Sequence, residues 1–303
     1  MKRENSWALN SFSVRRLLLM CQIYDKDQID RVMESLSERG FDEGQDDLLD
    51  LIARKTLLVL SRDILKSIRV MREIFTSRLA IVPLIFGIQS SNKSPVMIDL
   101  AYYLNIPNIV STDTVKETLR IYKGRPRSVL GDDHLSYSDY LVDSREVSKG
   151  VQVDIEKAIR QGKSIILCGH NLFLPYIFEL HSSGLFPAPI SNRAEQASEG
   201  VGEGDGEAES PAPLYYLPSQ SEDLINLLFV PILLKADLKK TRVDIKTKRS
   251  LELLQDEIIS NTLNNTQNWP LHLVVHNPDN PQTTSRTIHQ IIIKSLQEII
   301  PST

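Results

Sequence analysis

Apolar residues along this chain fall into two patterns. In five segments they follow one another almost without interruption, as in AIVPLIF at 80–86. Runs of this length are typical of strands that are buried on both faces of a parallel sheet. The other four lie near residues 108–110, 164–170, 223–234 and 272–276. Between these runs, apolar residues recur every three or four positions, which predicts helices.

This alternation predicts a three-layer α/β domain over residues 78–303, in which helices cover both faces of a parallel sheet. Pro83 lies inside the first predicted strand and lacks a backbone donor, so we expect that strand to be imperfect there. The predicted helices span residues 96–104, 144–161, 250–261 and 284–299. One more helix is predicted after an acidic turn at 111–113, and it ends at residue 120.

Residues 1–77 contain no strand-like run and are predicted to be helical. One helix covers 11–20 after serine caps, and a second covers 26–39 and ends at Gly40. One or two more are expected across 46–75. We interpret this region as a helical cap that packs on the α/β domain.

Composition narrows the possible classes of protein. The chain has 303 residues and a net charge of -4, which gives no argument for nucleic-acid binding. Its two cysteines, Cys21 and Cys168, lack the CxxC spacing of a zinc site and favour a reducing compartment. No apolar run reaches the roughly 18 residues of a membrane span, and Glu4 interrupts the basic start that a secretory signal needs. We therefore expect a cytoplasmic protein without nucleic-acid or membrane partners, and a weak organelle-targeting segment stays open.

A polar segment of unusual composition lies between the third and fourth predicted strands. Residues 195–213 consist almost entirely of Gly, Glu, Ala, Ser and Pro. Such a segment cannot bury enough apolar surface to fold, so a disordered acidic insertion is predicted.

The turn after the first strand reads GIQSSNKS at 87–94. It differs from the phosphate-loop pattern GxxxxGK[ST] only at Asn92, which stands where the second glycine belongs. Asn is one of the few other residues that adopt left-handed backbone angles readily. A helix that starts near Ser94 would direct free N–H groups at the loop, and Pro95 suits its first turn. The spacing alone leaves two interpretations open, a phosphate loop and an ordinary surface turn.

The following residues, IPNIVSTDTVKETLR at 106–120, are more specific. Together with the loop, residues 81–120 resemble the archaeal 2-phosphoglycerate kinase family and its eukaryotic P-loop relatives. The resemblance implies an ATP-dependent phosphotransferase that uses Mg²⁺ and acts on a small phosphorylated acceptor, for which an inositol phosphate is one option. In that family the N-terminal helices resemble a nucleotide-sensing ATP-cone module, which is the alternative to a simple cap.

The resemblance also implies roles for individual residues. Lys93 would bind the β- and γ-phosphates, Ser94 the magnesium ion, and Asp113 the metal or the acceptor hydroxyl. Arg242 would stabilise the migrating phosphoryl group, and Asn277 would lie near the adenine. The implied phosphate cradle comprises Gly87, Ser90, Ser91, Asn92, Lys93 and Ser94, and the implied acceptor site adds Arg120 and Arg249 to Asp113. The basic segment that holds Arg242 and Arg249 has an alternative interpretation as a solvated helix.

The chain departs from the family at the end of the third strand. Cys168 stands where the family has a glutamate that serves magnesium, and neutral cysteine does not replace an oxygen ligand. His170 follows, either as a catalytic group or as a hydrogen-bonded histidine at a strand end. His272 and His276 lie four apart on a predicted strand, so we expect no zinc pair there. The alternative function is therefore a catalytically impaired P-loop protein that binds nucleotide or a protein partner as a regulatory module.

Overall fold

The computed structural model describes residues 11–37, 67–68, 70–71, 74, 79–88, 91, 93–124, 136–179, 215–217, 227–239, 245–265 and 271–299. The predicted acidic insertion at 195–213 lies outside these residues, as does most of the helical prediction across 46–75. Within that prediction, the described positions 67–68, 70–71 and 74 are helical.

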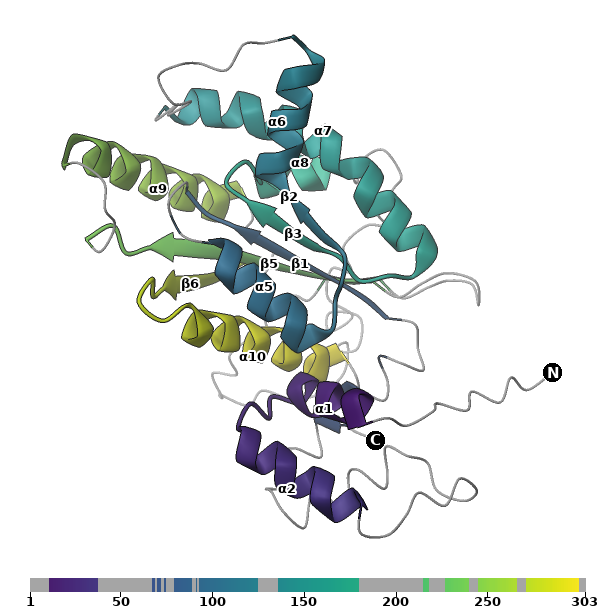
Figure 1. The fold of residues 1–303 in the computed structure, drawn as a ribbon. Coiled ribbons are helices and arrows are strands. Elements are labelled where there is room, and N and C mark those ends of the chain that lie inside the picture. The colour runs from purple at the N-terminus through teal and green to yellow at the C-terminus, as the bar shows by residue number, and fades with distance from the viewer. Residues whose placement is uncertain are drawn as a thin grey trace, which may run out of the picture.

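A parallel sheet forms the centre of the molecule and confirms the predicted fold class (Figure 1). Its five parallel strands stand in the order β2-β3-β1-β5-β6, so the first strand in the chain is the central one. A short sixth strand, β4, pairs antiparallel with the start of β5. The strands are β1 Ala80–Phe86, β2 Ile109–Ser111, β3 Ile166–Gly169, β4 Tyr215–Leu217, β5 Leu227–Ala236 and β6 His272–His276.

Pro83 does not interrupt β1, although it removes one backbone donor as expected. The strand is continuous and every one of its residues is buried. On one side, β1 pairs with β5 along its whole length, and Pro83 lies opposite Val230. On the other side, the pairing with β3 begins at Leu84, one residue after the proline. The missing donor therefore lies where the β1–β3 ladder starts, which is how a central strand accommodates it.

Helices cover both faces of the sheet (Figure 1). Side chains of β1 alternate between two buried clusters, because successive residues of a strand point to opposite faces. Ile81 and Ile85 join the cluster of α5 and α10, whereas Val82 and Leu84 join that of α7, α8 and α9. These helices are α5 Lys93–Leu104, α7 Tyr137–Gln161, α8 Leu174–Glu179, α9 Ile245–Asn265 and α10 Pro281–Ile299.

The N-terminal helices α1 Ser11–Met20 and α2 Lys26–Ser37 share the first of these clusters with α5 and α10. Tyr24 fixes the contact, since its hydroxyl lies 2.6 Å from Nδ1 of His289 on α10. The ring of His289 stacks on Tyr103 of α5, with 5.8 Å between centroids. These two helices therefore pack against the α/β domain, and the choice between a simple cap and a nucleotide-sensing module stays a prediction.

Element boundaries differ from the prediction at several helix starts. The helix α6 spans Thr112–Tyr122, so Asp113 lies in its first turn and not in a turn before it. The helix α7 begins at Tyr137, before the predicted start at 144, and α9 begins at Ile245. Both of these starts lie in polar stretches, where periodicity of apolar residues gives little signal.

Candidate functional site

The strands β1 and β3 are neighbours at the centre of the sheet, and the chain leaves them toward opposite faces. After β1 it continues into α5 on one face, and after β3 it continues into α8 on the other (Figure 1). Ligands of open α/β sheets bind at the carboxyl ends of strands, at a switch point of this kind. Three polar residues follow the strand ends here: Lys93 after β1, Asp113 after β2 and His170 after β3.

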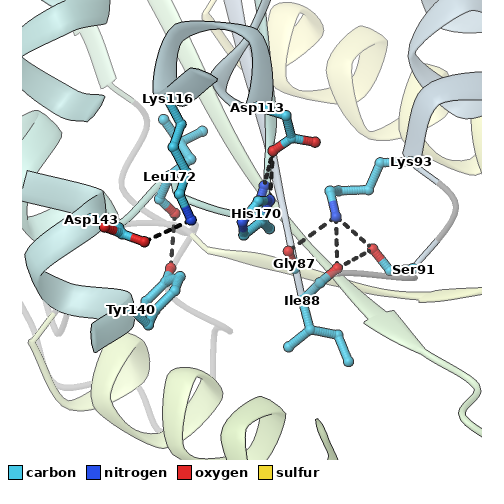
Figure 2. Close-up of polar contacts among 10 residues, drawn as sticks. All are labelled: Gly87, Ile88, Ser91, Lys93, Asp113, Lys116, Tyr140, Asp143, His170 and Leu172. Atoms are coloured by element: carbon cyan, nitrogen blue, oxygen red, sulfur yellow. Dashed lines mark hydrogen bonds and ion pairs between the residues drawn. The ribbon is translucent and has the colours of Figure 1, made fainter. Parts of the chain in front are cut away.

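The loop after β1 closes on the side chain of Lys93, the first residue of α5 (Figure 2). The Lys93 ammonium donates to the carbonyl oxygens of Gly87 at 3.1 Å and Ile88 at 2.7 Å. It also donates to Ser91 Oγ at 2.9 Å, and Ser91 Oγ in turn donates to the Ile88 carbonyl at 2.8 Å. All three donors of the ammonium are thus engaged by the loop itself. A phosphate group can reach this ammonium only if at least one of these bonds opens.

Lys93 is buried, with 8% of its surface exposed, and burial lowers the pKa of its ammonium. The negative charge of the Asp113 carboxylate acts in the opposite direction, by favouring the charged form of Lys93. Gly87 has a packing reason to lack a side chain, because a Cβ there would lie 2.5 Å from the Leu234 carbonyl oxygen of β5. The glycine of the loop therefore follows from close packing of the β1 and β5 ends, without reference to a ligand.

Asp113 and His170 form the second part of the site (Figure 2). Oδ1 of Asp113 lies 2.5 Å from Nδ1 of His170 and 3.5 Å from its backbone nitrogen. Burial alone would raise the pKa of Asp113, but the hydrogen bond and charge of His170 and the charge of Lys93 outweigh it and lower the pKa. The side chains remain accessible, with 56% of Asp113 and 21% of His170 exposed.

Gly169 allows this contact by its lack of a side chain. A Cβ at Gly169 would lie 1.6 Å from Oγ1 of Thr112 and 3.2 Å from Oδ1 of Asp113. The first turn of α6 thus rests directly on the end of β3, which brings Asp113 to the residue after Gly169. Beside it, Lys116 of α6 pairs with Asp143 of α7 at 2.7 Å and ties the two helices together (Figure 2).

Cys168 gives this strand end no metal ligand of the usual kind. The thiol is buried, and burial raises its pKa to about 12, so it stays protonated at neutral pH. Among the described residues, no group of three or more histidine, cysteine, aspartate or glutamate side chains could hold a metal ion. The oxygen ligands that this region offers to magnesium are the exposed hydroxyl of Ser94 and the Asp113 carboxylate.

Three further predicted site residues belong to the described part of the chain, namely Arg120, Arg249 and Asn277. Arg120 pairs with Glu117 on α6, about 10 Å along the helix from Asp113 at a rise of 1.5 Å per residue. Arg249 is exposed on α9. Asn277 follows β6 and donates its backbone N–H to Thr284 Oγ1 at 3.2 Å. Ser90, Asn92 and Arg242 lie outside the described residues.

One residue near the site was not given a role from the sequence. His276 ends β6, is buried, and has Nδ1 3.1 Å from Thr284 Oγ1. Burial lowers its pKa, and the charge of Lys93 lowers it further, so this histidine is neutral at physiological pH. Its position at the carboxyl end of a predicted strand was the available signal.

No protein-family model matches this chain, and no curated protein is significantly similar to it. What the structure shows is an α/β sheet that is compatible with a P-loop-like fold. In the part of the chain that is described, no helix has the length and hydropathy that crossing a bilayer requires.

Proposed function

We propose that this protein is an ATP-dependent phosphotransferase of the 2-phosphoglycerate kinase type, acting on a small phosphorylated acceptor. The observation that carries the proposal is the meeting of Lys93 with the Asp113–His170 pair at the carboxyl ends of three neighbouring strands. A cation and an accessible acid–base pair at one switch point are the parts that phosphoryl transfer needs, because that reaction depends on positioning and on charge stabilisation.

The residues present suit ATP and magnesium in charge and number. Lys93 starts α5, where backbone N–H groups of the first helical turn favour an anion. Magnesium in such sites takes one or two protein ligands and completes its shell with phosphate oxygens and water. Because His170 occupies Oδ1 of Asp113, we assign the metal to the Ser94 hydroxyl and the phosphates, and Asp113 to the acceptor side. When bound, magnesium would neutralise the developing charge on the β- and γ-phosphates.

A thermal shift experiment tests nucleotide binding. ATP with magnesium at about 100 times its dissociation constant should stabilise the protein by about 2.7 kcal/mol, which raises Tm by roughly 5–11 °C at about 2–4 °C per kcal/mol. Lys93→Met keeps the length of the side chain and removes its charge, so the shift should disappear. Lys149→Met, an exposed lysine on α7, is the matched control and should keep the shift.

Transfer itself is measured as ADP formation with 2-phosphoglycerate and with a set of inositol phosphates. A magnesium-dependent shift together with ADP formation supports the phosphotransferase. If neither ATP nor ADP shifts the Tm of the wild type, with or without magnesium, the proposal fails.

A second candidate is a P-loop protein that binds nucleotide or a protein partner as a regulatory module without catalysis. It is favoured by one specific observation, the complete engagement of the Lys93 ammonium by its own loop. The lack of a carboxylate at Cys168 points the same way. A Lys93-dependent thermal shift without ADP formation from any tested acceptor would favour this candidate over the phosphotransferase.

A further inference from the structure

The pair formed by Asp113 and His170 leaves one reactive atom without a role, Nε2 of His170. We propose that His170 is the catalytic base of the transfer reaction, which accepts the proton of the acceptor hydroxyl, and that Asp113 is its positioning residue. This inference rests on the phosphotransferase function proposed above and names the group that activates its acceptor.

The geometry fixes which nitrogen carries the proton. Asp113 presents Oδ1 to both the ring and the backbone of His170, at 2.5 Å from Nδ1 and 3.5 Å from the backbone nitrogen. An ionised carboxylate only accepts hydrogen bonds, so Nδ1 must donate. The neutral imidazole then carries its proton on Nδ1, and Nε2 keeps the lone pair that a general base requires.

The position of the ring suits an acceptor that approaches from solvent. His170 follows β3, the strand beside β1, and its side chain is 21% exposed whereas Lys93 is 8% exposed. Lys93 and Asp113 lie close enough for each charge to shift the pKa of the other group. Because β1 and β3 are neighbouring parallel strands, a hydroxyl that binds at Nε2 would lie at the same edge of the sheet as a phosphate that Lys93 holds.

The step balances with ATP as the phosphoryl donor. The acceptor oxygen forms a bond to the γ-phosphorus, and the bond between that phosphorus and the β–γ bridging oxygen breaks. The hydroxyl proton moves to Nε2 of His170 and then to water. The products are ADP and the phosphorylated acceptor, and no oxidant or reductant takes part.

Asp113 is the weaker choice for the base. One of its oxygens already accepts from His170, and its pKa lies below the ordinary carboxyl range. The carboxylate instead orients the ring and stabilises the imidazolium that forms.

The test compares variants in magnesium-dependent ADP formation, with 2-phosphoglycerate and with water as acceptors. His170→Gln should lower kcat by at least about 100-fold, the size of a general-base contribution, and leave the ATP-induced thermal shift in place. His170→Ala should regain activity when imidazole is added, which a structural role would not produce. Asp113→Asn should lower kcat more than it changes KM for ATP. His272→Gln, on β6, is the matched control and should remain active.

The outcomes separate the base role of His170 from the phosphotransferase function. If His170→Gln keeps kcat while Lys93→Met abolishes turnover, the phosphotransferase stands and His170 is not its base. Activity of His170→Ala that does not respond to imidazole also overturns the base role, provided that its thermal stability matches that of His170→Gln. A wild type that forms no ADP with 2-phosphoglycerate, with any of the inositol phosphates or with water overturns both proposals.

Discussion

The contact between α6 and β3 makes Gly169 the most sensitive backbone position of the candidate site. Replacing Gly169 with alanine would put the new Cβ 1.6 Å from Thr112 Oγ1 and 2.7 Å from Thr112 Cβ. Carbon atoms in contact stand about 3.5–4.0 Å apart, so the first turn of α6 has to move by more than an ångström. Thr112 is fully buried, which leaves its side chain no open direction in which to rotate away.

The expected cost follows from this overlap. Overpacking a well-packed core costs about 1–3 kcal/mol, and more when the backbone must shift. We expect Gly169→Ala to lose about 3 kcal/mol, which lowers Tm by roughly 6–12 °C. Because Asp113 is adjacent to Thr112, the displacement should also separate Asp113 from His170. Urea denaturation at an unchanged m-value measures the loss of stability.

Two further variants show whether the clash is the cause. Thr112→Ala in the Gly169→Ala background removes Oγ1 and should recover part of the lost stability. Gly150→Ala is the comparison variant, because its Cβ would meet one Val115 methyl group at 2.7 Å while alanine favours the α7 helix, so it should cost less than Gly169→Ala. A Gly169→Ala protein as stable as the wild type would refute the reasoning, as would a double variant that recovers nothing.

Two more predictions concern groups outside the catalytic proposals. Burial lowers the pKa of His289 to about 4, against 6.5 for an ordinary histidine, so between these values the unfolded chain binds the extra proton. The free energy of unfolding of the wild type should therefore fall by up to about 3 kcal/mol as pH falls through this window. His289→Phe should lose less stability over the same range. Urea midpoints of the two proteins that depend equally on pH would contradict this role of His289. Burial raises the pKa of the Cys168 thiol to about 12, so Cys168 should resist iodoacetamide at pH 8 in the native state and react in urea. Peptide mass spectrometry measures the alkylation. Rapid alkylation of Cys168 in the native protein would contradict its burial.

The sequence was sufficient for the parallel strands, because a strand buried on both faces must be apolar throughout and β1 is. It was insufficient for β4, whose three residues have a strand partner only through tertiary pairing with β5. The start of α6 was also misplaced. Ser111 stands at the N-terminal cap position of this helix, but its side chain makes no capping hydrogen bond.

The candidate site was also predictable from the sequence only in part. Lys93 could be singled out from the loop pattern, but its engagement with the loop carbonyls depends on how the backbone closes around it. Asp113 and His170 are 57 residues apart in the chain, and their pairing depends on β2 and β3 being neighbours. Strand order is a property of the whole fold, so periodicity along one segment could not reveal this pair.

The engaged ammonium of Lys93 has a consequence for affinity. An anion at this loop has to compete with the Gly87 and Ile88 carbonyls for the same donors. Only the fraction of molecules with a released lysine is then competent, and the apparent dissociation constant is the intrinsic one divided by that fraction. Each ~1.4 kcal/mol in favour of the closed arrangement weakens apparent affinity tenfold. Such a loop selects by charge density, because chloride offers the lysine little in exchange whereas a polyphosphate offers several oxygens at once.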